Sequence, residues 1–100
     1  MKLQFSNLEP AEVVNRLQEQ LQNRKLGDLV RFELTGDDIR VSIQKMGTST
    51  LEFQHKKTGT LHEWILTQEK IAFTHRAFKG EMMEKIEALV AKAGGSLQLS

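Results

Sequence analysis

The sequence predicts an α+β fold in which one antiparallel sheet, a meander of five or six strands, carries two helices on one face. Two observations lead to this prediction. From residue 29 to residue 75, apolar and polar residues alternate in five successive bursts separated by polar or glycine-bearing turns. An amphipathic helical pattern stands on each side of that block. A short alternating segment opens the chain, so the expected order of elements is β-α-β-β-β-β-β-α.

The first two elements are a short strand and a helix. Leu3 and Phe5 alternate with polar neighbours, which is typical of a strand with one buried face. Asn7 is a suitable cap for the helix that follows, and Pro10 falls in its first turn, where the missing N–H breaks no helical hydrogen bond. Four apolar residues at helical spacing form its buried stripe: Val13, Val14, Leu17 and Leu21.

Five strands are expected next, at residues 30–35, 39–44, 51–54, 60–67 and 71–75. The fourth is apolar on both faces around Trp64, which favours a central or doubly covered position. In the fifth, Ile71 and Phe73 are expected to face the core. Because every connection is short, consecutive strands should be antiparallel neighbours.

The second helix is expected from Lys79 or Gly80 to Ala93. Its apolar stripe consists of Met82, Met83, Ile86, Leu89, Val90 and Ala93. Two glycines then end the helix. The tail from Ser96 to Ser100 alternates again, and it is either a short edge strand or a frayed end.

The length and composition are those of one globular domain spanning residues 1–100, and the lack of a signal-like segment leads us to expect a cytoplasmic protein. Its 39% apolar and 27% charged residues are ordinary for a soluble protein. No long apolar run and no signal-like segment is present, so we expect neither a membrane span nor secretion. The absence of cysteine excludes disulfides and thiol chemistry. A net charge of +1 argues against nucleic acid as a partner.

Histidine is the residue type here that titrates near neutral pH, and His55, His62 and His75 are the candidates for catalysis or metal binding. Such a role requires the three rings to converge. His55 and His75 are instead expected at strand ends as exposed residues, and Glu63 is the one carboxylate close to the group in sequence. We therefore predict no catalytic, cofactor or metal site, and no enzymatic activity.

A pocket for a small apolar ligand is the other arrangement that these residues allow. It would lie between the sheet and the last helix, lined by Trp64, Phe73, Met82, Met83 and Ile86. Methionine suits such a site because its flexible side chain adapts to irregular apolar shapes. The same residues are also what a small domain needs simply to fill its core.

The run Phe78-Lys79-Gly80-Glu81-Met82, with Ile86 beyond it, leads from an expected strand pair into the last helix. This pattern, within residues 59–86, resembles the C-terminal half of the small polyhydroxyalkanoate-system proteins of bacteria. The resemblance implies a strand-to-helix corner and no functional residue. The order of elements also resembles a shortened helix-grip fold, in which a long C-terminal helix lies across a curved sheet with an apolar ligand between them.

The function expected from the sequence is therefore that of a small non-enzymatic binding or adaptor domain, with a protein partner or self-association. Binding of a small apolar ligand is the alternative. An open meander has two edges, and the short strands near Leu3 and Leu97 are weakly specified. We accordingly expect a homodimer that pairs through these terminal strands.

Overall fold

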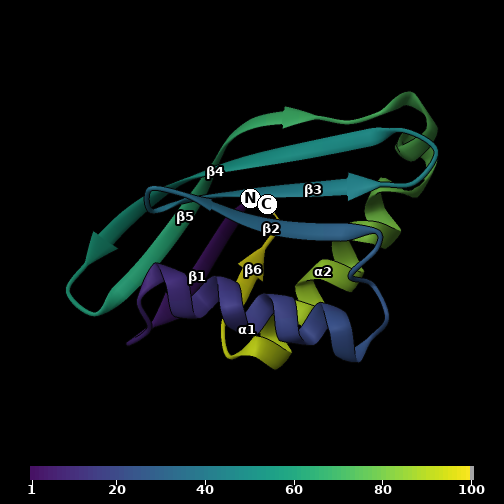
Figure 1. Cartoon of the computed structure of the whole chain (residues 1–100). Coiled ribbons are helices and arrows are strands. Elements are labelled where there is room, and N and C mark those ends of the chain that lie inside the picture. Colours follow the sequence, from purple (N-terminus) through teal and green to yellow (C-terminus); the bar gives the residue numbers. More distant parts are fainter. Residues whose placement is uncertain (100) are drawn as a thin grey trace.

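The computed structural model describes residues 1–99, which form a six-stranded antiparallel sheet covered by two helices (Figure 1). The strand order across the sheet is β2-β3-β4-β5-β1-β6. The elements are β1 (Lys2–Ser6), α1 (Pro10–Asn23), β2 (Val30–Thr35), β3 (Asp38–Gln44), β4 (Thr48–Thr58), β5 (Leu61–Lys70), the 3₁₀ helix η1 (Phe73–Phe78), α2 (Lys79–Ala93) and β6 (Ser96–Gln98). The predicted α+β class and the single antiparallel sheet are confirmed.

The meander from β2 to β5 has the register that the apolar alternation predicts. Phe32 lies opposite Val41, and Val41 lies opposite Leu51. All three side chains are buried, so they form a continuous apolar row across three strands. A bulge between Glu52 and Phe53 shifts the register of β4 against β5, and bulges of this kind bend a strand.

The chain ends meet in the sheet, where β1 lies between β5 and β6. Leu3 pairs with Trp64 on one side and with Leu97 on the other. The tail is therefore an edge strand as far as Gln98, and Ser100 lies outside the described residues. Gly95 makes the turn into β6 possible, because an added Cβ would lie 2.6 Å from the Phe5 ring and from the Gln4 carbonyl oxygen.

The two helices lie on the same side of the sheet and contact each other (Figure 1). Helix α1 buries Val13, Leu17 and Leu21 as predicted. Helix α2 buries a stripe of five residues, namely Met83, Ile86, Leu89, Val90 and Ala93. The expected Asn7 cap was wrong: Glu9 is the N-cap of α1, and Asn7 instead turns the chain with φ 61°. Within residues 1–99, no helix is long and apolar enough to cross a membrane.

The strand expected at residues 71–75 was also wrong. β5 extends to Lys70, and the chain then turns into η1, where the Phe73 side chain is 83% exposed. The physical reason is that the free side of β5 is taken by β1, whose Lys2 pairs with Ile65. The sixth strand of the sheet therefore comes from the C-terminal tail.

Candidate functional site

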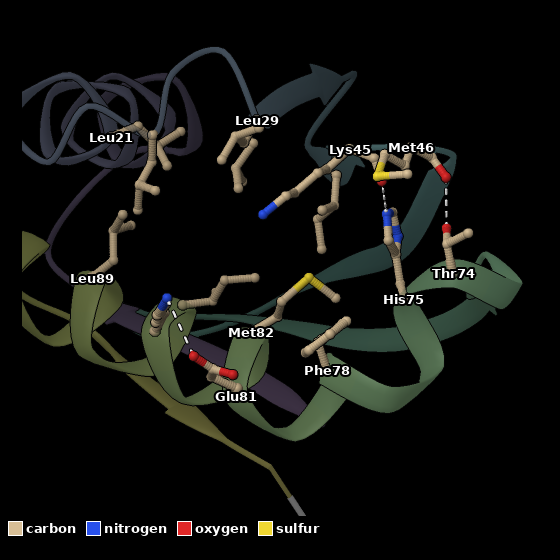
Figure 2. A pocket seen from close by; sticks show the side chains of 15 residues that line it. Leu21, Leu29, Lys45, Met46, Thr74, His75, Phe78, Glu81, Met82 and Leu89 are labelled. Carbon is tan, nitrogen blue, oxygen red and sulfur yellow. Dashed lines mark hydrogen bonds and ion pairs between the residues drawn. The ribbon is translucent and has the colours of Figure 1, made fainter.

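A pocket of about 320 Å³ opens between α2, the C-terminal end of α1 and the end of the β2–β3 hairpin that lies beside η1 (Figure 2). Four of its apolar lining side chains are themselves buried, and these form its floor: Leu21, Ile43, Ile86 and Leu89. Its rim carries exposed apolar groups, with Met46 at 85% and Phe78 at 58% exposure. The pocket therefore combines a buried apolar floor with an open mouth, which is the usual form of a small-molecule site.

The structure brings two of the five predicted pocket residues together. Met82 and Ile86 line the pocket. Met83, next to Met82, points into the core at 4% exposure, since adjacent helix residues face different directions. Trp64 is fully buried among other core residues, and Phe73 lies on the exposed surface of η1.

Sequence reasoning missed the opposite wall of the pocket. Leu26 and Leu29, in the connection after α1, are half-buried and face the space across from α2, together with Val30 at the start of β2. These residues are far from α2 in sequence, so no local periodicity links them to it. The available signal was the presence of apolar residues in a connecting segment, where polar ones are usual.

The rim of the pocket is held by the tight turn between β3 and β4. Met46 and Gly47 both have positive φ, 53° and 133°. The Lys45 carbonyl accepts a hydrogen bond from Nε2 of His75 at 2.6 Å, and the Met46 carbonyl accepts one from Oγ1 of Thr74 at 2.7 Å (Figure 2). A positive φ at a residue other than glycine persists where its surroundings enforce it. These two bonds from η1 therefore fix the turn.

His75 was expected to be exposed, and this was wrong, because it is buried at 4% exposure between two hydrogen bonds. A carbonyl can only accept, so Nε2 of His75 carries the hydrogen that bonds to Lys45. In the neutral ring Nδ1 is then an acceptor, and it lies 2.5 Å from Oγ of Ser49. The same Oγ accepts the Ala72 amide at 2.8 Å. Ser49 is 0% exposed, so this serine–histidine pair acts as a structural bridge.

Three charged side chains line the mouth of the pocket: Lys45, Glu81 and Lys85. Lys85 and Glu81 form an i,i+4 ion pair at 3.6 Å on α2. Figure 2 shows the ammonium group of Lys45 extending over the open space toward the centre of the pocket. Across residues 1–99, no ion pair or hydrogen bond is formed by this ammonium group.

The histidines do not form a single cluster. The rings of His55 and His62 stack, with Nε2 of His55 at 2.8 Å from Nδ1 of His62. They cover Trp64, whose indole Nε1 donates to the Asp37 carbonyl at 2.7 Å. His75 lies at the other end of β4, beside Ser49. In the part of the chain that is described, no three histidine or carboxylate groups are placed to hold a metal ion.

Glu63, the carboxylate nearest this pair in sequence, is engaged elsewhere. It accepts hydrogen bonds from Lys2 at 2.9 Å and from Gln4 at 3.1 Å. These bonds, the Lys2 bond first, hold the pKa of Glu63 below its ordinary value of 4.5. Its partners both come from β1, so Glu63 ties β5 to β1.

Comparison with protein-family models, with curated proteins and with solved structures finds no match for this chain. The likeness of residues 59–86 to polyhydroxyalkanoate-system proteins stays a prediction. The function is therefore argued from the geometry of the pocket itself.

Proposed function

We propose that this chain is a non-enzymatic cytoplasmic binding domain that takes up a small apolar molecule in the pocket beside α2. The single observation that carries the proposal is the form of this pocket, which has buried leucine and isoleucine side chains at its floor and an open mouth. Binding is favourable at a concave apolar surface of this kind, because the ligand displaces water from it. Of the two functions expected from the sequence, the pocket favours the small-ligand binder.

The size of the pocket restricts the ligand. Its volume of about 320 Å³ lies at the lower end of the range for small-molecule sites, roughly 300–1,000 Å³. An apolar cavity of ~150 Å³ holds one benzene molecule, so this pocket has room for about a dozen non-hydrogen atoms. A medium-length alkyl chain or one small ring system fits, and a large polycyclic lipid does not.

A titration with decanol, monitored by amide chemical shifts, tests the proposal. We expect saturable shifts for residues of α2 and of the connection after α1. Met82→Trp places a large ring in the pocket and should abolish binding, because Met82 lines it. Glu84→Trp is the matched control, since Glu84 is an exposed residue of the same helix outside the lining. Equal binding by both variants would place the ligand elsewhere.

A second candidate function, self-association, is favoured by the outer edge of β2, which pairs with no other strand within residues 1–99 and on which the Phe32 carbonyl accepts a hydrogen bond from Nε2 of Gln18. The outer edges of the sheet are β2, with six residues, and β6, with three. β1 is paired on both sides, so of the two terminal strands only β6 leaves an edge open. An unpaired edge can join its symmetry mate across a two-fold axis. Light scattering decides the matter: a dimer mass that Leu34→Pro reduces to a monomer mass, with the fold retained, would place the contact at β2, because the register turns the Leu34 amide away from β3.

A further inference from the structure

We infer that the ligand is an amphipathic anion, a medium-length alkyl chain with one carboxylate or similar acidic group, and that Lys45 is the residue that binds the acidic group. The inference rests on the proposed function, because it concerns the same pocket. It adds the chemical class of the ligand and a residue that determines specificity. Two independent observations carry it, namely the way Lys45 is held and the balance of charge around the mouth.

The first observation is that the backbone of Lys45 is fixed at the rim. Its carbonyl oxygen accepts the 2.6 Å bond from His75, and its amide donates to the Gly47 carbonyl at 3.0 Å. The preceding residue, Gln44, donates its amide to the Leu29 carbonyl at 2.7 Å, across the start of β2. Because the backbone is held on both sides, the position from which the Lys45 side chain extends is fixed. Figure 2 shows it directed across the mouth, with Nζ above the apolar floor.

The second observation is that the neighbouring cations have partners. On α2, Lys85 is paired with Glu81, and Lys79 is paired with Glu69 of β5. On η1, the guanidinium of Arg76 lies over the Phe73 ring, 5.8 Å from its centroid. His75 uses both ring nitrogens for Ser49 and the Lys45 carbonyl. The ammonium group of Lys45 is thus the charge that remains available to a ligand at the mouth.

A ligand seated in this pocket covers Lys45 and removes part of its water. A neutral ligand does not compensate the ammonium group for its lost hydration, which is unfavourable. An anionic group replaces the lost water with an ion pair. The alkyl part then lies toward Leu21 and Leu89, at the end of the pocket away from η1 (Figure 2). Decanoate, with a ten-carbon chain, has the dozen or so non-hydrogen atoms for which the pocket has room.

The experiment compares three ligands that share one alkyl chain, namely decanoate, decanol and decyltrimethylammonium. The two ions are kept below their micelle-forming concentrations and decanol below its solubility limit. Affinities are measured by amide shift titration on the full chain at low salt. We expect decanoate to bind about fivefold more tightly than decanol, the upper range for an exposed ion pair. The cation should bind more weakly than decanol. Added salt should reduce the preference for decanoate, because it screens exposed charges.

Three variants test whether the preference for decanoate over decanol is due to Lys45. Lys45→Met keeps the apolar stem and removes the charge, so decanoate and decanol should then bind equally. Lys57→Met is the matched control, because Lys57 is an exposed lysine near the other end of β4 and should leave the preference unchanged. Glu81→Gln removes the anion at the mouth and releases Lys85, so it should raise the affinity for decanoate alone.

The outcomes separate the inference from the function on which it rests. If decanol and decanoate bind the unaltered chain equally, the inference is overturned and the apolar-ligand function stands. If the preference for decanoate survives in Lys45→Met, the assignment to Lys45 is overturned. If none of the three ligands binds, the proposed function itself is contradicted.

Discussion

Oγ of Ser49 lies 2.5 Å from Nδ1 of His75, and this buried contact joins the first residues of β4 to η1. The opposite ring nitrogen of His75 bonds to the carbonyl of Lys45. One imidazole therefore links the core to the turn that carries the rim of the pocket. Because His75 bonds to the Lys45 backbone, the buried bridge also helps to position Lys45, the residue that we propose to bind the acidic group of the ligand.

Ser49→Ala should destabilise the protein by about 1–3 kcal/mol, because the Ala72 amide and Nδ1 of His75 lose their partner in a buried place. Urea unfolding monitored by circular dichroism measures the change. Ser42→Ala, which removes a half-buried hydroxyl group from the adjacent strand β3, is the control and should cost clearly less. Equal losses for the two variants would mean that the bridge contributes no specific stability.

Gly47→Ala should lower the thermal midpoint more than either of two other glycine substitutions. A Cβ at Gly47 would lie 2.9 Å from Oγ1 of Thr74, and the residue has φ 133°. Gly36→Ala has a positive φ of 63° and open space, so it isolates the backbone strain of about 1–2 kcal/mol. Gly27→Ala has neither cost. A Gly47→Ala loss no greater than that of Gly36→Ala would show that the contact with Thr74 is unimportant.

Trp64→Phe should reduce stability by about 1–3 kcal/mol and leave ligand affinity unchanged. The substitution removes buried volume and the hydrogen bond from Nε1 to the Asp37 carbonyl, which leaves a carbonyl unpaired. Trp64 is outside the pocket lining, whereas Met82 is part of it. Met82→Ala should therefore have the opposite profile, with weaker decanol binding and a smaller loss of stability. A fall in affinity with Trp64→Phe would extend the site into the core.

Glu63→Gln should alter the pH dependence of the free energy of unfolding. The pKa of Glu63 is lowered in the folded state, first by Lys2 and then by Gln4, so its contribution is present above the ordinary value of 4.5. That contribution is lost as the pH falls through the lower folded-state pKa. The difference in unfolding midpoint between the two proteins should therefore be larger at neutral pH than in acid. A difference that stays flat across the same pH range would contradict this account of Glu63.

The sheet could be predicted from the sequence because the alternation of neighbouring residues shows which face of each strand is buried. The alternation of Phe32, Val41 and Leu51 with polar residues determines which face is buried and, with short turns, the pairing. The same reasoning failed for Ile71 and Phe73. They alternate like a strand, but the position beside β5 belongs to β1, which arrives from the other end of the chain.

The candidate site was less predictable than the fold, because it is assembled from distant segments. Met82 and Ile86 were found from the helical stripe, which is a local pattern. Leu29 and Lys45 belong to separate connections, and only the tertiary structure brings them to α2. The burial of His75 likewise depends on partners 26 and 30 residues away, Ser49 and Lys45.

The central claim is that a ligand occupies the pocket beside α2, and the four methionines provide the most direct measurement. Met46 and Met82 line the pocket, Met83 is buried in the core, and Met1 is packed against the core near the chain ends. The chain is prepared with ¹³C-labelled methionine methyl groups and titrated with decanoate. Single leucine substitutions of Met46, Met82 and Met83 assign their signals, and the remaining signal is that of Met1.

We expect the Met46 and Met82 methyl signals to shift together along one saturable curve, while Met1 and Met83 stay in place. Met83 is the sharpest control, since it neighbours Met82 in sequence and faces away from the pocket. Saturable shifts confined to Met1 or Met83, or four signals that do not move at saturating decanoate, would contradict the claim that this pocket is the binding site.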